Sequence, residues 1–254
     1  MILQPIDPDL RLPTAEELPS SDETPVDNER QNDIPNWLKA ILSVIWAERQ
    51  DWFFGVDMGI YDDEGRLRRT PIIPDGFLSI GVTRHKGDSG RLSYVLAEED
   101  NIPPVFVLEY VSQTYNGEYE EKLHIYARMQ VMYVVLYNPN YFRRQNHEPF
   151  EVYRLEGNRY RRCDGEPVWM PELGLGIGRV RGLLEGIEQE WLAWFDQSGT
   201  PYPLTFEMID QLQSQLQQQQ QRFEQERQRA DAERQRAERL AERLRSLGID
   251  PDET

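Results

Sequence analysis

The sequence predicts an α/β fold in which helices flank a mixed sheet and a long helix follows at the C-terminus. The apolar runs at 105–111 and 131–137 have the pattern of buried strands, and a helical stretch at about 118–129 lies between them. Nearly all of the 12 Tyr, 9 Phe and 6 Trp occur between Trp37 and Phe206, which places the core there. Strand, helix and strand in this order favour a parallel pair inside the sheet.

The N-terminal residues differ from this core. Residues 1–34 hold five prolines and nine acidic residues against two arginines. Such a segment can bury little apolar surface, so it is predicted to be a disordered, acidic and proline-rich leader.

The first helix is predicted over residues 35–50. Apolar residues recur there at helical spacing, and Pro35 suits the first turn of such a helix. These apolar residues are Trp37, Leu38, Ile41, Leu42, Ile45 and Trp46.

Strands are then expected over 52–56, 58–61 and 72–82. The last of these is interrupted by Pro74-Asp75-Gly76, and a polar loop at about 83–101 follows it. This pattern predicts the first half of the sheet.

Shorter strands follow the helix-connected pair. Residues 151–155, 159–163 and 168–169 have the pattern of a meander, and 183–195 resembles a closing helix with four aromatic or leucine side chains for packing. Between them, Gly174, Gly176 and Gly178 lack the lysine and helix of a phosphate-binding loop, so a tight extended loop is expected.

The C-terminal segment 207–247 contains neither Gly nor Pro and predicts a helix of ~60 Å. A heptad written from Ile209 has apolar seam positions at both ends and polar ones in the middle. A coiled coil and a solitary charged helix therefore both stay open, and a homodimer could form through the core or through this helix. The domain limits that follow are 35–206 for the core, 207–247 for the helix and 248–254 for a tail.

Charge and cysteine content restrict the functions that are open to the chain. With 28 basic and 45 acidic residues the formal net charge is -17, so nucleic-acid binding needs a local basic patch, a metal or a partner. The lone Cys163 excludes an internal disulfide, which fits a reducing compartment. No apolar run approaches ~18 residues and no basic–apolar signal opens the chain, so a cytoplasmic protein without a membrane span is expected.

Two carboxylates carry the candidate chemistry. Glu109 ends the apolar run Val105–Leu108, where an unpartnered carboxylate would be costly to bury. Asp75 follows Pro74 at the irregularity in the preceding strand, and a plain turn role is equally open for it. Strand ends that deliver two carboxylates can hold a divalent metal beside a phosphodiester.

A lysine completes this constellation. Lys122 is one of only three lysines beside 25 arginines, and it offers a compact charge that can orient water or stabilise a phosphate. A surface pair with Glu118 is its alternative role. Tyr126 lies on the same helical face. The three histidines show no metal-ligand spacing with one another or with Cys163, which argues against a zinc site.

Three segments resemble a known family. They are the residues from Pro74 to Val82 (PDGFLSIGV), from Val107 to Ser112 (VLEYVS) and from Glu121 to Arg128 (EKLHIYAR). They are similar to the Uma-two family, endonucleases of cyanobacterial type in the PD-(D/E)xK restriction-endonuclease-like superfamily. The resemblance covers about 36–203, and the C-terminal tail is also similar to members of the group.

The resemblance implies a restriction-endonuclease-like core with Mg²⁺ or Mn²⁺ held by Asp75 and Glu109. The family pattern places a lysine two residues after the second acid, where this chain has Val111, so the resemblance assigns the lysine role to Lys122. Gln113 stands where a lysine is expected in close relatives. Gln113 and Tyr126 are auxiliary candidates, and so is Glu48 as a third carboxylate, although the sequence favours a helix-surface role for Glu48.

The leading hypothesis is therefore a metal-dependent endonuclease that hydrolyses DNA phosphodiester bonds with Asp75, Glu109 and Lys122. The alternative is a catalytically degenerate interaction module that keeps the nuclease fold and assembles through its C-terminal helix. The negative net charge, Val111 and Gln113 favour this alternative.

Overall fold

The computed structural model describes residues 13–19, 29–63, 70–88, 90–111, 117–144, 147–184 and 187–203, with six single residues between 219 and 236. Contacts within the chain separate one unit that ends at Pro203 from a second that begins at Leu204. Gln113 and, apart from those six positions, the helix expected over 207–247 lie outside the described residues. Their roles stay predictions.

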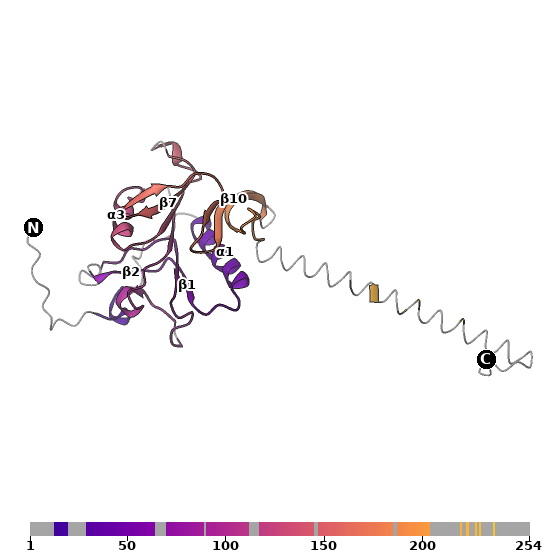
Figure 1. The fold of residues 1–254 in the computed structure, drawn as a ribbon, viewed down its shortest axis with the longest axis horizontal. Helices are drawn as coiled ribbons and strands as arrows, with labels where there is room; N and C mark the ends of the chain where they lie inside the picture. The colour runs from indigo at the N-terminus through magenta and orange to yellow at the C-terminus, as the bar shows by residue number, and fades with distance from the viewer. Residues whose placement is uncertain are drawn as a thin grey trace, which may run out of the picture. The chain divides into compact units, whose positions relative to one another are not determined.

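A six-stranded sheet forms the centre of the first unit, in the order β1-β3-β5-β6-β7-β8 (Figure 1). The strands are β1 (Trp52–Val56), β3 (Gly76–Ile80), β5 (Phe106–Tyr110), β6 (Tyr133–Tyr137), β7 (Phe150–Glu156) and β8 (Arg159–Arg162). Only the β5–β6 pair of this sheet is parallel. The predicted mixed sheet is thus confirmed.

Within the described residues, two helices flank this sheet, α1 (Glu29–Ile45) and α3 (Glu121–Arg128). They lie on opposite sides of it, with β1 and β7 between them in the view of Figure 1. Helix α3 connects the parallel strands β5 and β6, as predicted. Its buried Tyr126 packs in one core cluster with Val107 of β5 and with Val134 and Leu136 of β6.

The first helix begins earlier and ends earlier than the predicted 35–50. It runs from Glu29 to Ile45, so Pro35 lies inside it and not in its first turn. The apolar periodicity could not reveal the preceding turns, because their residues are mostly polar. Pro35 has no N–H for the carbonyl of Gln31. The Pro35 ring packs on Gly76, where an added Cβ would come within 3.0 Å of the Pro35 Cβ.

The predicted closing helix over 183–195 is wrong. Residues Ile187–Phe195 form β11, which pairs with the glycine-bearing strand β10 (Leu175–Leu184), and β9 (Val168–Met170) completes this second sheet. The tight loop expected at the glycines is limited to Gly174, which lies in the turn before β10, whereas Gly176 and Gly178 lie in the strand. Gly176 and Gly178 face Phe195 so closely that an added Cβ would come within 3.1 and 3.0 Å of its side chain.

The second sheet packs against α1. The indole Nε1 of Trp194 on β11 donates a 2.9 Å hydrogen bond to the carbonyl of Leu38. Trp194 also packs against Phe106 of β5, with ring centroids 5.1 Å apart. A run of buried residues can form a strand or a helix, and here the partner strand β10 decides for the strand.

The remaining elements are short. They are the parallel pair β2 (Ile60–Tyr61) and β4 (Tyr94–Val95) and the 3₁₀ turns η1 (Ala15–Glu17), η2 (Leu96–Glu98) and η3 (Phe142–Arg144). Within the described residues, no helix has the length and apolar character needed to cross a membrane.

Candidate active site

Asp75 and Glu109 face each other at one end of the sheet. In the antiparallel β3–β5 register Gly76 is paired with Leu108, so the residue before Gly76 lies opposite the residue after Leu108. The strand register therefore brings together two sequence-predicted acids that are far apart in the chain. Their exposed fractions are only 6% for Asp75 and 1% for Glu109.

Asp75 is held by two donors from different elements. Gln31 Nε2 of α1 donates to Asp75 Oδ1 at 2.8 Å, and the backbone N–H of Tyr110 donates to Oδ2 at 2.6 Å. Burial, together with the negative charge of Glu109, raises the pKa of Asp75 to about 8. This carboxyl group therefore tends to keep a proton near neutral pH unless a cation compensates its charge.

Glu109 is held by α3. Lys122 Nζ lies 2.7 Å from Glu109 Oε2, and the Tyr126 hydroxyl donates to Oε1. Lys122 and Tyr126 stand four residues apart, so they occupy one face of the helix. The role of Lys122 as a mere surface partner of Glu118 is not what this geometry favours, since Lys122 reaches the buried Glu109.

The charges in this group stabilise a protonated lysine. Burial alone would lower the pKa of Lys122, but the carboxylates of Glu109, Glu118 and Asp75 raise it. Burial raises the pKa of Glu109, and Lys122 opposes that effect. Burial and the charge of Glu109 raise the pKa of the Tyr126 hydroxyl well above its usual range, so it remains a donor.

The local sequence explains why these side chains converge. Every residue of β5 is buried, so Glu109 has no access to bulk water and must find partners inside the protein. Gly117 adopts a left-handed φ of 78° just before α3, and its carbonyl accepts the Lys122 N–H at 3.0 Å. This turn starts the helix with Lys122 directed at the strand end.

One other sequence candidate, Glu48, is not brought to the site, and Val111 stands where the family pattern has a lysine. Glu48 is exposed in the turn after α1, and no described contact joins it to either acid. Val111 is buried and its N–H bonds to the carbonyl of Tyr137, so its backbone extends the pairing of β5 with β6. Val111 therefore offers no cation at the position where the family pattern has lysine.

Gln31 is a site residue that the sequence reasoning missed. It lies in the residues that were assigned to the leader, and no apolar periodicity marks it. An amide that projects from the early turns of a helix is ordinary surface chemistry in a sequence. Only the packing of α1 on Gly76 brings its side chain to Asp75.

The donor set fits a magnesium ion. Each of the four carboxylate oxygens accepts one hydrogen bond, which leaves a further lone pair on each for a cation. Among the described residues no group of three or more His, Cys, Asp or Glu side chains gathers. Mg²⁺ is commonly bound through one or two carboxylates with waters and substrate phosphate as its other ligands, so two acids suffice.

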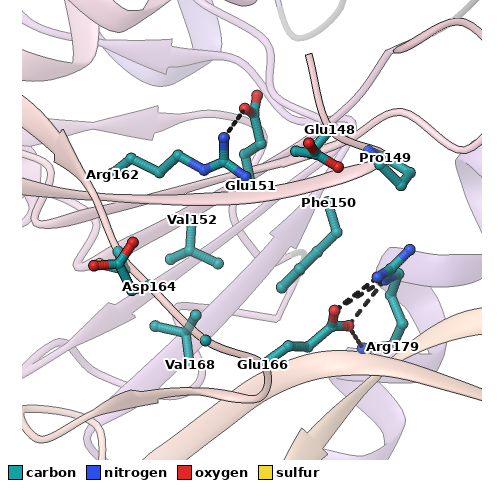
Figure 2. A pocket seen from close by; sticks show the side chains of 12 residues that line it. Glu148, Pro149, Phe150, Glu151, Val152, Arg162, Asp164, Glu166, Val168 and Arg179 are labelled. Atoms are coloured by element: carbon teal, nitrogen blue, oxygen red, sulfur yellow. Dashed lines mark hydrogen bonds and ion pairs between the residues drawn. The ribbon is translucent and has the colours of Figure 1, made fainter. Parts of the chain in front are cut away.

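A separate cavity of about 430 Å³ lies away from these acids, between β7, β8 and the segment that leads to β9 (Figure 2). Charged side chains that line this cavity form ion pairs with one another. Glu151 contacts Arg162 at 3.0 Å and Glu166 contacts Arg179 at 2.8 Å. Paired charges of this kind bind the walls to one another, so these pairs leave little uncompensated charge for a ligand.

The raised pKa of Asp75 predicts a pH-dependent stability of the metal-free protein. The folded-state pKa of about 8 exceeds the ordinary 3.8, so between these values the folded chain holds a proton that the unfolded chain has released. The contribution of Asp75 is thus fully present at low pH and is lost as pH rises towards 8. Denaturant titrations in EDTA at pH 5, 6.5 and 8 should show a steeper decline for the wild type than for Asp75→Asn.

The matched control is Asp88→Asn, which removes an exposed carboxylate. Its stability should depend on pH as that of the wild type does. The other carboxylates whose pKa values are lowered by ion pairs are present in all three proteins, so they contribute equally to each pH dependence. Equal slopes of stability against pH in the wild type and in Asp75→Asn would contradict the raised pKa of Asp75.

Comparison with known proteins gives one informative match. The family model Uma2, described as "Putative restriction endonuclease", matches residues 21–184, a range that includes Gln31, Asp75, Glu109, Lys122 and Tyr126. No curated protein and no solved structure matches the chain.

Proposed function

The chain belongs to the Uma2 family, described as "Putative restriction endonuclease", and on this premise we propose that it is a metal-dependent endonuclease that hydrolyses DNA phosphodiester bonds. The single observation that carries the proposal is the convergence of two buried acids with a lysine at one end of the sheet. Asp75, Glu109 and Lys122 come from three different elements, and a purely structural role would not require both acids in one place. A restriction-endonuclease-like core is part of the same proposal.

Asp75 and Glu109 would hold the ion. When bound, Mg²⁺ supplies Lewis-acid stabilisation of phosphoryl oxygen charge and a more acidic water. The chain's own contribution is to fix the acids. Gln31 and the Tyr110 N–H orient Asp75, and Lys122 and Tyr126 orient Glu109. Preorganised ligands of this kind need no rearrangement at the moment of reaction.

Lys122 would provide the positive charge that a phosphodiester needs during hydrolysis. Its side chain is 19% exposed, so the ammonium group pairs with Glu109 while part of the side chain stays accessible. An ammonium group with three donors can contact a carboxylate and a phosphate oxygen or water together. In this role Lys122 stands in for the lysine that the family pattern has at Val111.

Cleavage and calorimetry together test the proposal. The purified full-length chain with Mg²⁺ or Mn²⁺ should nick or linearise plasmid DNA, and EDTA should stop the reaction. Calorimetry should show Mn²⁺ binding that Asp75→Asn and Glu109→Gln remove. Absence of both cleavage and acid-dependent Mn²⁺ binding would instead support the degenerate assembly module, whose oligomeric state should then depend on residues 207–254.

Gln31 supplies a further prediction. Because Gln31→Ala removes the donor that orients Asp75 Oδ1, we expect Mn²⁺ affinity to fall by about tenfold, as is typical when a partner of a metal ligand is lost. Calorimetry measures this change. Asn36→Ala, which alters an exposed amide of the same helix bonded to Asn32, is the matched control and should bind Mn²⁺ like the wild type. Equal affinities in the two variants would remove Gln31 from the site.

A further inference from the structure

Two cations near β1 have no acidic partner in the part of the chain that the structure describes. Among the described residues neither Lys39 on α1 nor Arg84 in the loop after β3 forms an ion pair. Both side chains are only partly exposed. Partly buried cations normally find a carboxylate, because burial of an uncompensated charge is costly.

Shortage of acids does not explain this absence. The chain has 45 acidic residues against 28 basic ones, and neighbouring cations are paired. Lys86 and Arg91 both contact Glu99 at 2.9 Å, and Arg49 contacts Asp51 at 2.9 Å. Lys39 and Arg84 are thus exceptions within their own surroundings.

The position of Arg84 is set by aromatic packing and by the backbone. Its guanidinium carbon lies 3.7 Å from the centre of the Trp52 ring, which belongs to the first residue of β1. Its N–H bonds to the carbonyl of Gln50 at 2.9 Å. A guanidinium group stacked in this way keeps its edge donors available for an anion.

Lys39 belongs to the same surface. It lies two helical turns before Trp46, whose N–H continues the helical pattern by bonding to the Leu42 carbonyl at 2.9 Å, so both residues project from one face. The Trp46 ring packs edge-on against the Trp52 ring, with 5.6 Å between the centroids. This face of α1 is therefore turned towards Trp52, on whose ring the Arg84 guanidinium stacks. Burial lowers the pKa of Lys39, and the positive charge of Arg84 lowers it further.

The pair lies well away from the two acids. Along α1, Lys39 lies eight positions after Gln31, which contacts Asp75, and at ~1.5 Å per residue this is ~12 Å. Along the sheet, Trp52 pairs with Ile80 and Val56 with Gly76, so at ~3.3 Å per residue Trp52 lies ~13 Å from the Asp75 end. The two independent routes agree.

We propose that Lys39 and Arg84 form a phosphate site that holds the DNA backbone a few nucleotides from the bond cleaved at Asp75 and Glu109. Phosphates of one strand are spaced by ~3.4 Å along the duplex axis, so a site ~12 Å from the acids lies within a few nucleotides of the cleaved bond. The position of the cleaved bond rests on the proposed function. A local cation pair also explains how a chain of net charge -17 can hold a polyanion.

DNA binding without metal tests the site separately from catalysis. In EDTA, fluorescence anisotropy with a 20-base-pair duplex should show that Lys39→Gln binds about tenfold more weakly than the wild type and that its slope of log affinity against log salt is smaller by about one. Arg84→Lys, which keeps the charge and loses the fork, should weaken binding less. Neither change should alter the Mn²⁺ affinity of the acids.

Arg161→Gln is the matched control. It removes one positive charge from β8, at the opposite edge of the sheet, where Arg161 is paired with Glu156. It should bind the duplex like the wild type. Thermal melting shows whether a variant with weaker DNA binding is still folded. Because Lys39→Gln relieves repulsion between two cations, its melting temperature should be no lower than that of the wild type.

Several outcomes would overturn the site: no duplex binding by the wild type, wild-type affinity in Lys39→Gln, equal losses in Lys39→Gln and Arg161→Gln, or a lower melting temperature that accompanies the loss. A different result would be that inorganic phosphate stabilises the wild type but not Lys39→Gln, while the two proteins bind DNA with equal affinity. This result would identify a free-phosphate site and reject the DNA contact. Failure of cleavage with Lys39-dependent DNA binding intact would reject the nuclease function alone.

Discussion

Asp75→Asn and Glu109→Gln should each lower metal-dependent DNA cleavage by about a thousandfold or more, since each removes one of the two anionic groups available to the ion. Both variants keep an oxygen that accepts a hydrogen bond. The amide oxygen introduced at position 75 can still accept from Gln31 or from the Tyr110 N–H, and the one introduced at position 109 can accept from Tyr126. The fold should therefore survive while the metal affinity falls.

The measurement is the initial rate of plasmid cleavage at saturating Mn²⁺, with circular dichroism to verify folding. Glu48→Gln is the matched control, because Glu48 is the exposed acid that the sequence offered as a third ligand. It should cleave at the wild-type rate. Retention of wild-type cleavage by folded Asp75→Asn would exclude Asp75 from catalysis, and a loss in Glu48→Gln would place a third acid in the site.

Lys122→Met should have the largest effect on stability. It leaves the carboxylate of Glu109 buried beside Glu118 and Asp75 without its cation, and the loss of one partner of a buried pair costs about 3–5 kcal/mol. Cleavage should also fall by about a hundredfold or more, because the charge that would face the phosphate is gone.

A double variant separates these two effects. Lys122→Met combined with Glu109→Gln should recover most of the lost stability in urea unfolding, since the uncompensated charge of Glu109 is gone, but should not recover cleavage. Lys86→Met is the matched control. Glu99 keeps its contact with Arg91 there, so the loss of stability should be smaller. A Lys122→Met protein as stable as the wild type would show that Glu109 is neutral in the folded state.

The members of the candidate site could be selected from the sequence because they stand out against their neighbours. Glu109 ends a run of apolar residues, and Asp75 interrupts another. Lys122 is one of the few lysines in a chain rich in arginine. The strand–helix–strand pattern around them also predicts the parallel pair β5–β6 correctly. In each case a local pattern along the chain carried the information.

The predictions that the structure contradicts were wrong for a different reason. The run at 183–195 is apolar enough for either a helix or a strand, and β10 decides it through pairing over nine residue pairs. The start of α1 was missed because its first turns are polar, and with it Gln31. The orientation of Gln31 towards Asp75 depends on Pro35 packing against Gly76, two residues that are far apart in the chain.

The two acids and the lysine illustrate the same division. By itself the sequence determined which residues could do the chemistry, since an isolated carboxylate in an apolar strand or a lone lysine is a local property. The tertiary structure alone decided that Asp75 lies opposite Glu109 and that Gln31 holds Asp75. It also decided that neither Lys39 nor Arg84 has an acidic partner among the described residues. Strand register and helix packing set these distances, and both arise from contacts between residues far apart in the chain, which no local pattern encodes.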